Sequence, residues 1–154
     1  MTAEHPKHRH RGATLVEFAL ISVVFVTVLM AIIEFGRWLS TLELVAETTR
    51  LGARMAVVCD LNDTTIKARM QSYLPMLGLT TSQISIAYAP GGCTPTVATG
   101  TPCQTVTVSL SGATFSPHIP FLAGAFPIPP FTTTLPRESM ESINAAGDVN
   151  PVCS

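Results

Sequence analysis

A single ionisable side chain stands inside a long apolar segment near the start of this sequence. From Ala13 to Ile33, Glu17 is the only charged residue. A carboxylate at membrane depth costs about 3 kcal/mol on insertion scales, so a residue of this kind marks a functional position. In a low dielectric the charge is unfavourable unless a cation matches it. The chemistry to expect from Glu17 is therefore charge pairing.

The apolar segment has the length of a membrane span. At about 1.5 Å per residue, a helix over 13–33 covers roughly 30 Å, the thickness of a bilayer core. Lys7, Arg9 and Arg11 precede it, whereas acidic residues occur beyond it. The positive-inside rule then predicts a cytoplasmic leader over 1–12, a transmembrane helix over 13–36 and export of everything that follows.

The sequence around Glu17 resembles a known processing signal. Residues 11–18 read Arg-Gly-Ala-Thr-Leu-Val-Glu-Phe and are similar to a type IV prepilin site, which is cut after glycine with glutamate fifth in the mature chain. Residues 32–37 (Ile-Ile-Glu-Phe-Gly-Arg), 49–54 (Thr-Arg-Leu-Gly-Ala-Arg) and 135–139 (Leu-Pro-Arg-Glu-Ser) resemble TadE-like pseudopilins of the tight-adherence (Tad/Flp) pilus systems.

This resemblance implies a function in pilus assembly. A prepilin peptidase would cut between Gly12 and Ala13, and the new amine at Ala13 would pair with Glu17 of a neighbouring subunit. The protein would be a minor pilin required for assembly of a Flp-type pilus. Its partners would be the peptidase, other pseudopilins, the major pilin and an inner-membrane assembly platform. It would cross the inner membrane once, with a cytoplasmic N-terminus and a periplasmic or extracellular domain.

Three other readings share part of this pattern. A secretory signal has an apolar region of only about 7–15 residues before a small-residue cleavage site, and Glu34-Phe35-Gly36-Arg37-Trp38 offers no such site here. An ordinary single-span anchor that tolerates Glu17 does not account for the spacing of Gly12 and Glu17. The alternative function is an uncleaved single-span envelope protein whose exported domain binds a surface or matrix ligand.

Composition argues for contact surface and against catalysis. Charged residues make up 12% of the chain, and no Asp, Glu, Lys or Arg occurs between Arg69 and Arg137. A neutral surface favours packing against other subunits. A net charge of −1 gives no support for nucleic-acid binding. His118 is a lone loop histidine with no acid nearby in the sequence, and Gly91-Gly92 lacks the helix and lysine of a phosphate loop. We therefore expect no enzyme and no cofactor.

Metal binding is not expected either. His5, His8 and His10 are better explained as part of a positively charged leader than as a metal tract. The four cysteines show no Cys-x2-Cys spacing, which argues against a zinc site.

One helix is predicted from Ala13 to about Val58, because the stretch has no proline and keeps an apolar stripe every three or four residues beyond the membrane. Its part over 37–58 would continue into the exported domain. Glu34, Arg37 and Trp38 would form an interfacial anchor, with Glu34 and Arg37 spaced one turn apart.

The remainder, 59–154, is predicted to form a small exported α+β domain of pilin-like layout. A second helix is expected over 64–74, with its N-cap at Asn62-Asp63-Thr64 and its end at Pro75. Alternating residues over 82–88, 104–110 and 131–135 predict an antiparallel sheet of about three strands. The apolar, proline-rich loop over 116–130 either folds back over the sheet or meets a partner, and both options stay open.

Four cysteines in an exported domain predict two disulfides. Cys93 and Cys103 flank a short loop between two expected strands and form the natural hairpin pair. Cys59, at the end of the long helix, would then bond to Cys153 near the C-terminus. Three connectivities are possible, and this one is favoured.

Overall fold

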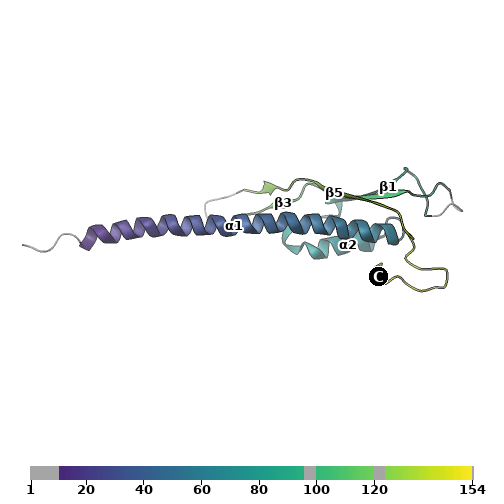
Figure 1. Ribbon diagram of the computed structural model, residues 1–154, viewed down its shortest axis with the longest axis horizontal. Coiled ribbons are helices and arrows are strands. Elements are labelled where there is room, and N and C mark those ends of the chain that lie inside the picture. Colours follow the sequence, from purple (N-terminus) through teal and green to yellow (C-terminus); the bar gives the residue numbers. More distant parts are fainter. Residues whose placement is uncertain (1–10, 96–99, 120–123, 154) are drawn as a thin grey trace, which may run out of the picture.

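One long helix dominates the molecule. The computed structural model describes residues 11–95, 100–119 and 124–153, and within them α1 runs from Arg11 to Val58. Figure 1 shows its N-terminal half standing clear of a small domain that is built on its C-terminal half. The single helix predicted from Ala13 to about Val58 is confirmed.

The C-terminal half of α1 is amphipathic and forms one wall of the core. Val45, Thr49, Ala53 and Ala56 recur every three or four residues and are all buried. This spacing places them on one face of the helix. The charged residues of the same stretch are exposed.

α2 covers one side of α1 and runs from Thr64 to Tyr73. The carboxylate of Asp63 caps it by accepting a hydrogen bond from the N–H of Thr65 at 2.9 Å. Ile66 and Met70 of α2 are fully buried. The helix ends at Tyr73, one residue before the predicted end. Pro75 begins a short 3-10 turn, Pro75–Leu77, and a second one follows at Thr81–Gln83.

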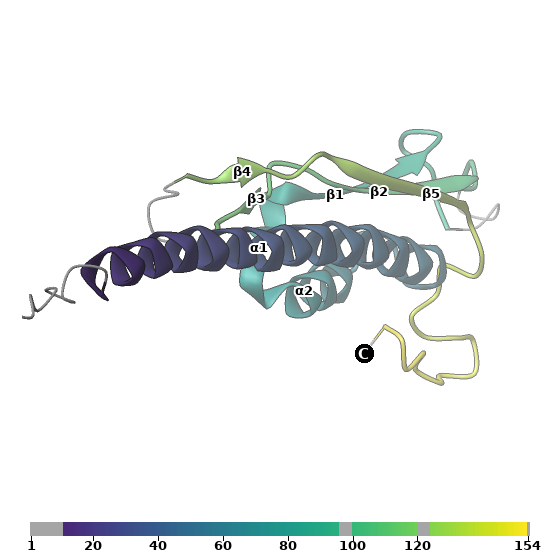
Figure 2. The same ribbon diagram turned by 60° about the vertical axis from the view of Figure 1, so that its left-hand side comes forward.

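A three-stranded antiparallel sheet covers the other side of α1, as Figure 2 shows. Its strands are β1 (Ile84–Ala89), β2 (Thr105–Leu110) and β5 (Phe131–Pro136), in the order β1-β2-β5. Val106, Val108 and Leu110 of the central strand are fully buried. The α+β fold, with a long apolar helix, a second helix and a sheet of three strands, is therefore confirmed.

The loop over 116–130 has structure of its own. β3 (Thr114–Phe115) pairs with β4 (Phe126–Pro127) in a separate two-stranded ladder. Ile128 is buried, and it packs with Val45 and Leu110 in a cluster at the end of the domain nearest the N-terminal half of α1. Phe121 and Leu122, two of the apolar residues for which the loop was expected to pack on the sheet or on a partner, lie outside the described residues.

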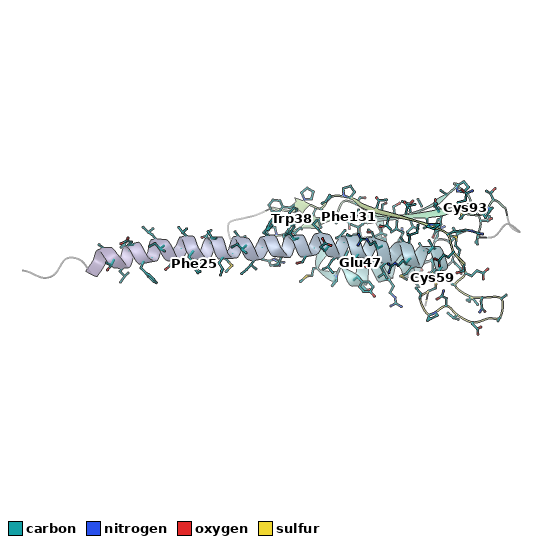
Figure 3. All side chains as sticks on the ribbon, viewed as in Figure 1. Phe25, Trp38, Glu47, Cys59, Cys93 and Phe131 are labelled. Atoms are coloured by element: carbon teal, nitrogen blue, oxygen red, sulfur yellow. A yellow bond between two sulfur atoms is a disulfide. The ribbon has the colours of Figure 1, made fainter. Side chains whose placement is uncertain are left out.

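Two disulfides close the domain at its far end, near the labelled Cys59 and Cys93 in Figure 3. Cys59 bonds to Cys153 and Cys93 bonds to Cys103, which are the pairs that the sequence favoured. The first bond fixes the C-terminal segment to the end of α1. The second closes the loop between β1 and β2.

Candidate functional site

The N-terminal half of α1 is a long apolar surface that the other described residues leave uncovered. Within the described part of the chain, Gly12–Val58 is the one helix long and apolar enough to cross a membrane, and no other described residue covers its apolar stretch. Phe18 is 73% exposed and Phe25 is 65% exposed, and Figure 3 shows side chains projecting above and below this part of the helix, with nothing packed on them. The protein thus presents one span of apolar side chains that water does not favour.

Gly12, Ala13 and Glu17 lie in the first two turns of this helix and are exposed. A Cβ added at Gly12 would have nothing within 4 Å, so the backbone here is open to another molecule. Among the described residues, Glu17 has no hydrogen-bond or ion-pair partner for its carboxylate. Its charge is therefore left for a cation from elsewhere.

A polar network lies where the bare helix meets the domain. The guanidinium of Arg37 donates to the carboxylate of Glu34 at 2.8 Å, one turn away, as the spacing predicted. The same nitrogen, Nη1, lies 2.9 Å from Nδ1 of His118. The backbone N–H of His118 donates to Oε1 of Glu34 at 2.9 Å.

His118 was misjudged from the sequence. It lies beside an acid and a base that are more than 80 residues away along the chain, so it is not an isolated loop residue. Only the fold brings these groups together. Its local sequence, Ser-Pro-His-Ile-Pro, gave no signal for these contacts, because the side chain is exposed and could equally have been satisfied by water.

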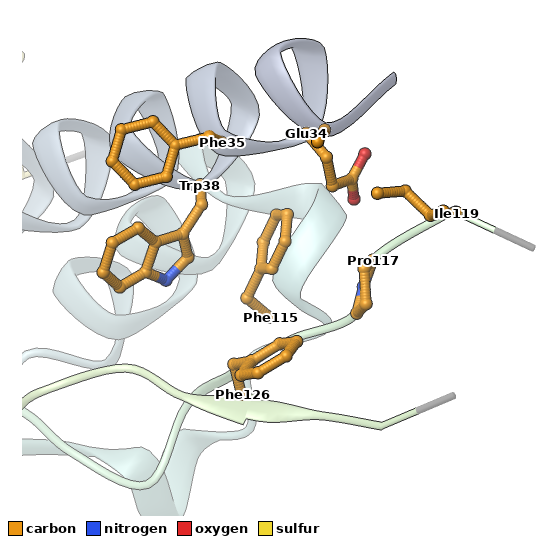
Figure 4. A pocket seen from close by; sticks show the side chains of 8 residues that line it. Glu34, Phe35, Trp38, Phe115, Pro117, Ile119 and Phe126 are labelled. Atoms are coloured by element: carbon orange, nitrogen blue, oxygen red, sulfur yellow. The ribbon is translucent and has the colours of Figure 1, made fainter. Parts of the chain in front are cut away.

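Trp38 lies beside this network, at the edge of an apolar pocket of about 360 Å³. Figure 4 shows its indole between the ring of Phe35 on α1 and the rings of Phe115 and Phe126 from the β3–β4 segment. The indole N–H of Trp38 is buried and has no hydrogen-bond partner among the described residues. Glu34, Arg37 and Trp38 therefore hold the 116–119 segment against α1. Their predicted place at a membrane interface stays a prediction.

A second polar cluster fixes the C-terminal segment to the start of α2. The hydroxyl of Ser142 donates to Asp63 at 3.1 Å, and the hydroxyl of Thr65 donates to the same carboxylate at 2.7 Å. Partial burial would raise the pKa of Asp63, but these bonds and the Thr65 N–H outweigh it and hold the pKa below its usual value. The cluster is fully used in joining two segments, so we assign it to stability.

Comparison with known proteins identifies the helical segment. Residues 12–54 match the model of the family described as TadE-like protein. The matched segment begins at Gly12 and contains Glu17 together with Glu34, Arg37 and Trp38, so the resemblance seen in the sequence is confirmed for this part of the chain. No curated protein matches the chain. No solved structure matches it either.

Proposed function

Residues 12–54 are TadE-like, and from this premise we propose that the protein is a minor pilin of a tight-adherence (Flp-type) pilus. A prepilin peptidase removes residues 1–12, and the mature protein assembles through its N-terminal helix. It contributes contact surface and performs no catalysis. Before assembly it stands in the inner membrane, with the leader in the cytoplasm and the domain outside.

The observation that carries this proposal is the bare half of α1 with one carboxylate in it. Apart from Glu17 and a few small polar residues, residues 12–33 are apolar. They are also uncovered. A lipid bilayer satisfies such a surface before assembly, and a bundle of like helices satisfies it afterwards. A membrane anchor alone has no use for a carboxylate in its second turn.

Cleavage supplies the cation that Glu17 lacks. Cutting after Gly12 frees an α-amine at Ala13, which is protonated at neutral pH. An ammonium group at a helix N-terminus is unfavourable for the helix dipole, so a nearby carboxylate relieves it. Glu17 lies four residues beyond Ala13, so pairing between two parallel helices displaces one by about 6 Å along the axis.

The test is the mass of the mature protein in cells that carry the pilus system. Wild-type protein should begin at Ala13. A Gly12→Leu variant should keep all 12 leader residues. The space beside Gly12 is open in the protein, and a branched side chain there would block the peptidase from the bond that it cuts. Gly36→Leu is the matched control: it places the same side chain on the same helix at another open glycine and should be processed normally.

Equal processing of wild type and Gly12→Leu would refute the cleavage site. A wild-type protein that still begins at Met1 in a pilus-forming cell would favour the uncleaved envelope protein instead. The two outcomes separate an error in the site from an error in the function.

A further inference from the structure

The exported half of α1 carries a stripe of four charges in a fixed order. Glu43 and Glu47 come first, and Arg50 and Arg54 follow. All four side chains are exposed. At 3.6 residues per turn they lie within about 60° of one another around the helix. We call these four residues the charge stripe.

The charge stripe lies opposite the core face of α1. Val45, Thr49 and Ala56 point into the domain, and the helical period places the stripe about half a turn away from them. Sheet and α2 lie on the other faces of the helix in Figure 2. From Met70 to Pro136, the stretch that holds all the strands of the sheet, the domain has no Asp, Glu, Lys or Arg, so the sheet offers the stripe no charged partner.

The order of the charges is unfavourable within one molecule. Glu43 and Glu47 are four residues apart, as are Arg50 and Arg54, and like charges at this spacing repel. One ion pair relieves the stripe: Glu47 meets Arg50 at 3.3 Å, with both side chains more than 60% exposed. Within the described residues, Glu43 and Arg54 have no ion-pair partner. An isolated solvated helix would gain from alternating these charges, so their segregation favours a partner outside the subunit.

A second copy of the chain complements the stripe in one arrangement. Parallel helices in register place Glu against Glu and Arg against Arg. Antiparallel helices pair all four charges but send the two membrane helices in opposite directions, which one membrane does not allow. Parallel helices displaced by seven residues, about 10 Å, pair Glu43 with Arg50 and Glu47 with Arg54 of the neighbour.

We propose that the charge stripe is a self-association surface, through which parallel copies of this chain pack with a seven-residue displacement. The inference rests on the proposed function, since it takes the copies to share one membrane. The displacement has the same sense as the one that joins Ala13 to Glu17. The two differ by three residues, about 4–5 Å along the axis, which the long Glu and Arg side chains span. Each contact joins the Glu half of one stripe to the Arg half of the next. Further copies can therefore be added in the same way, as a filament requires.

Cysteine cross-linking in native membranes tests the displacement. Leu39 and Ala46 flank the stripe seven residues apart and leave its charges intact, and the four native cysteines are already bonded to one another. Two tagged full-length copies, one Leu39→Cys and one Ala46→Cys, should give a mixed disulfide dimer under mild oxidation. The Leu39→Cys copy alone reports in-register contact and should cross-link severalfold less.

Charge reversal then tests the cause. Glu43→Arg with Glu47→Arg turns two attractions into repulsions and should lower the 39–46 cross-link about tenfold. Adding Arg50→Glu and Arg54→Glu restores complementarity at the same displacement and should restore the cross-link.

Three results would overturn the inference: a stronger 39–39 than 39–46 cross-link, no cross-link between copies, or a product with a different protein. A quadruple reversal that fails to restore the dimer would overturn the charge mechanism. If the chain is cleaved after Gly12 and supports pili in any of these cases, the proposed function stands without this surface.

Discussion

At the scale of single residues, His118 is the residue that closes the network at the base of the domain. Arginine has only donors, so Nδ1 of His118 must accept the hydrogen bond from Arg37 and the proton of the neutral ring lies on Nε2. The side chain of Arg37 also lies 5.5 Å from the ring centre of Phe115, a cation–π distance. Arg37 therefore contacts both ends of the 115–118 segment, Phe115 and His118, and joins them to α1.

Loss of the His118 ring should loosen this segment from α1. His118→Ala removes one hydrogen-bond acceptor for Arg37 and should lower the free energy of unfolding by about 1 kcal/mol. Trp38 is the single tryptophan of the chain, and its indole lies against the same segment. Its fluorescence in detergent-solubilised full-length protein should shift to longer wavelength as water gains access. His118→Asn keeps an acceptor near the position of Nδ1 and should shift less; identical spectra for wild type and His118→Ala would show that the network does not hold the segment.

The sequence predicted the local half of this network and not the distant half. Glu34 and Arg37 are one helical turn apart, and helical spacing alone puts their side chains together. His118 joins them from 81 residues beyond Arg37, and no period in the sequence encodes such a contact. Glu17 illustrates the opposite limit, because a charge in an apolar run is visible in the sequence while no partner for it is found among the described residues.

At the scale of elements, the packing of α2 on α1 depends on one missing side chain. A Cβ at Gly52 would lie 2.4 Å from Sδ of Met70, and Met70 is fully buried. Gly36, on the same helix, has no atom within 4 Å of that position. Of the small residues on α1, Gly52 thus serves packing within the domain, whereas Gly36 is open.

Alanine at these two glycines should have opposite effects on the free energy of unfolding. Both substitutions favour the helix by about 1 kcal/mol. Gly52→Ala also forces Met70 to move within a packed core, which costs about 1–3 kcal/mol, so we expect a net loss for Gly52→Ala and a gain or no change for Gly36→Ala. Denaturant unfolding of the full chain in micelles measures both. Combining Gly52→Ala with Met70→Ala should be less harmful than the sum of the two changes; strict additivity would exclude the clash.

The elements that sequence patterns predict well are those with a long, regular period. α1 and the three main strands lie within two residues of their predicted ends, since each has a clean apolar repeat. β3 and β4 were not predicted, because each has two residues, and β4 ends at Pro127. Their pairing is decided by the packing of Phe115 and Ile128 against α1 and the core, which is tertiary information.

At the scale of the whole molecule, two disulfides of unequal span close the domain. Cys59–Cys153 encloses 94 residues and Cys93–Cys103 encloses 10. A disulfide restricts the unfolded chain, and this effect grows with the logarithm of the span. The first bond should therefore stabilise the folded state by about 4–5 kcal/mol and the second by about 2–3 kcal/mol.

Replacing Cys59 and Cys153 together by Ser should therefore lower the unfolding temperature more than replacing Cys93 and Cys103. Thermal unfolding of the two double variants in the same detergent makes the comparison. The longer link also fixes the segment that carries Ser142, so its loss should raise protease sensitivity near the C-terminus. A larger loss from the Cys93–Cys103 variant would mean that local strain or packing, and not chain entropy, decides the order.

The last prediction concerns the fibre, because the unpaired charge of Glu17 has meaning only among several molecules. Glu17→Gln keeps the size of the side chain and removes the charge, so membrane insertion should be unchanged or easier. Pairing with the amine at Ala13 would be lost, and cells that carry this variant in place of wild type should lose fibres in electron micrographs and lose surface attachment. Cleavage after Gly12 should continue, which separates a defect in assembly from a defect in processing.

Glu17→Asp is the matched control, since it keeps the charge on a side chain one methylene shorter and should retain part of the fibre yield. Normal fibres with Glu17→Gln would show that the carboxylate is not used for assembly, and absence of fibres with both variants would show that reach matters as much as charge.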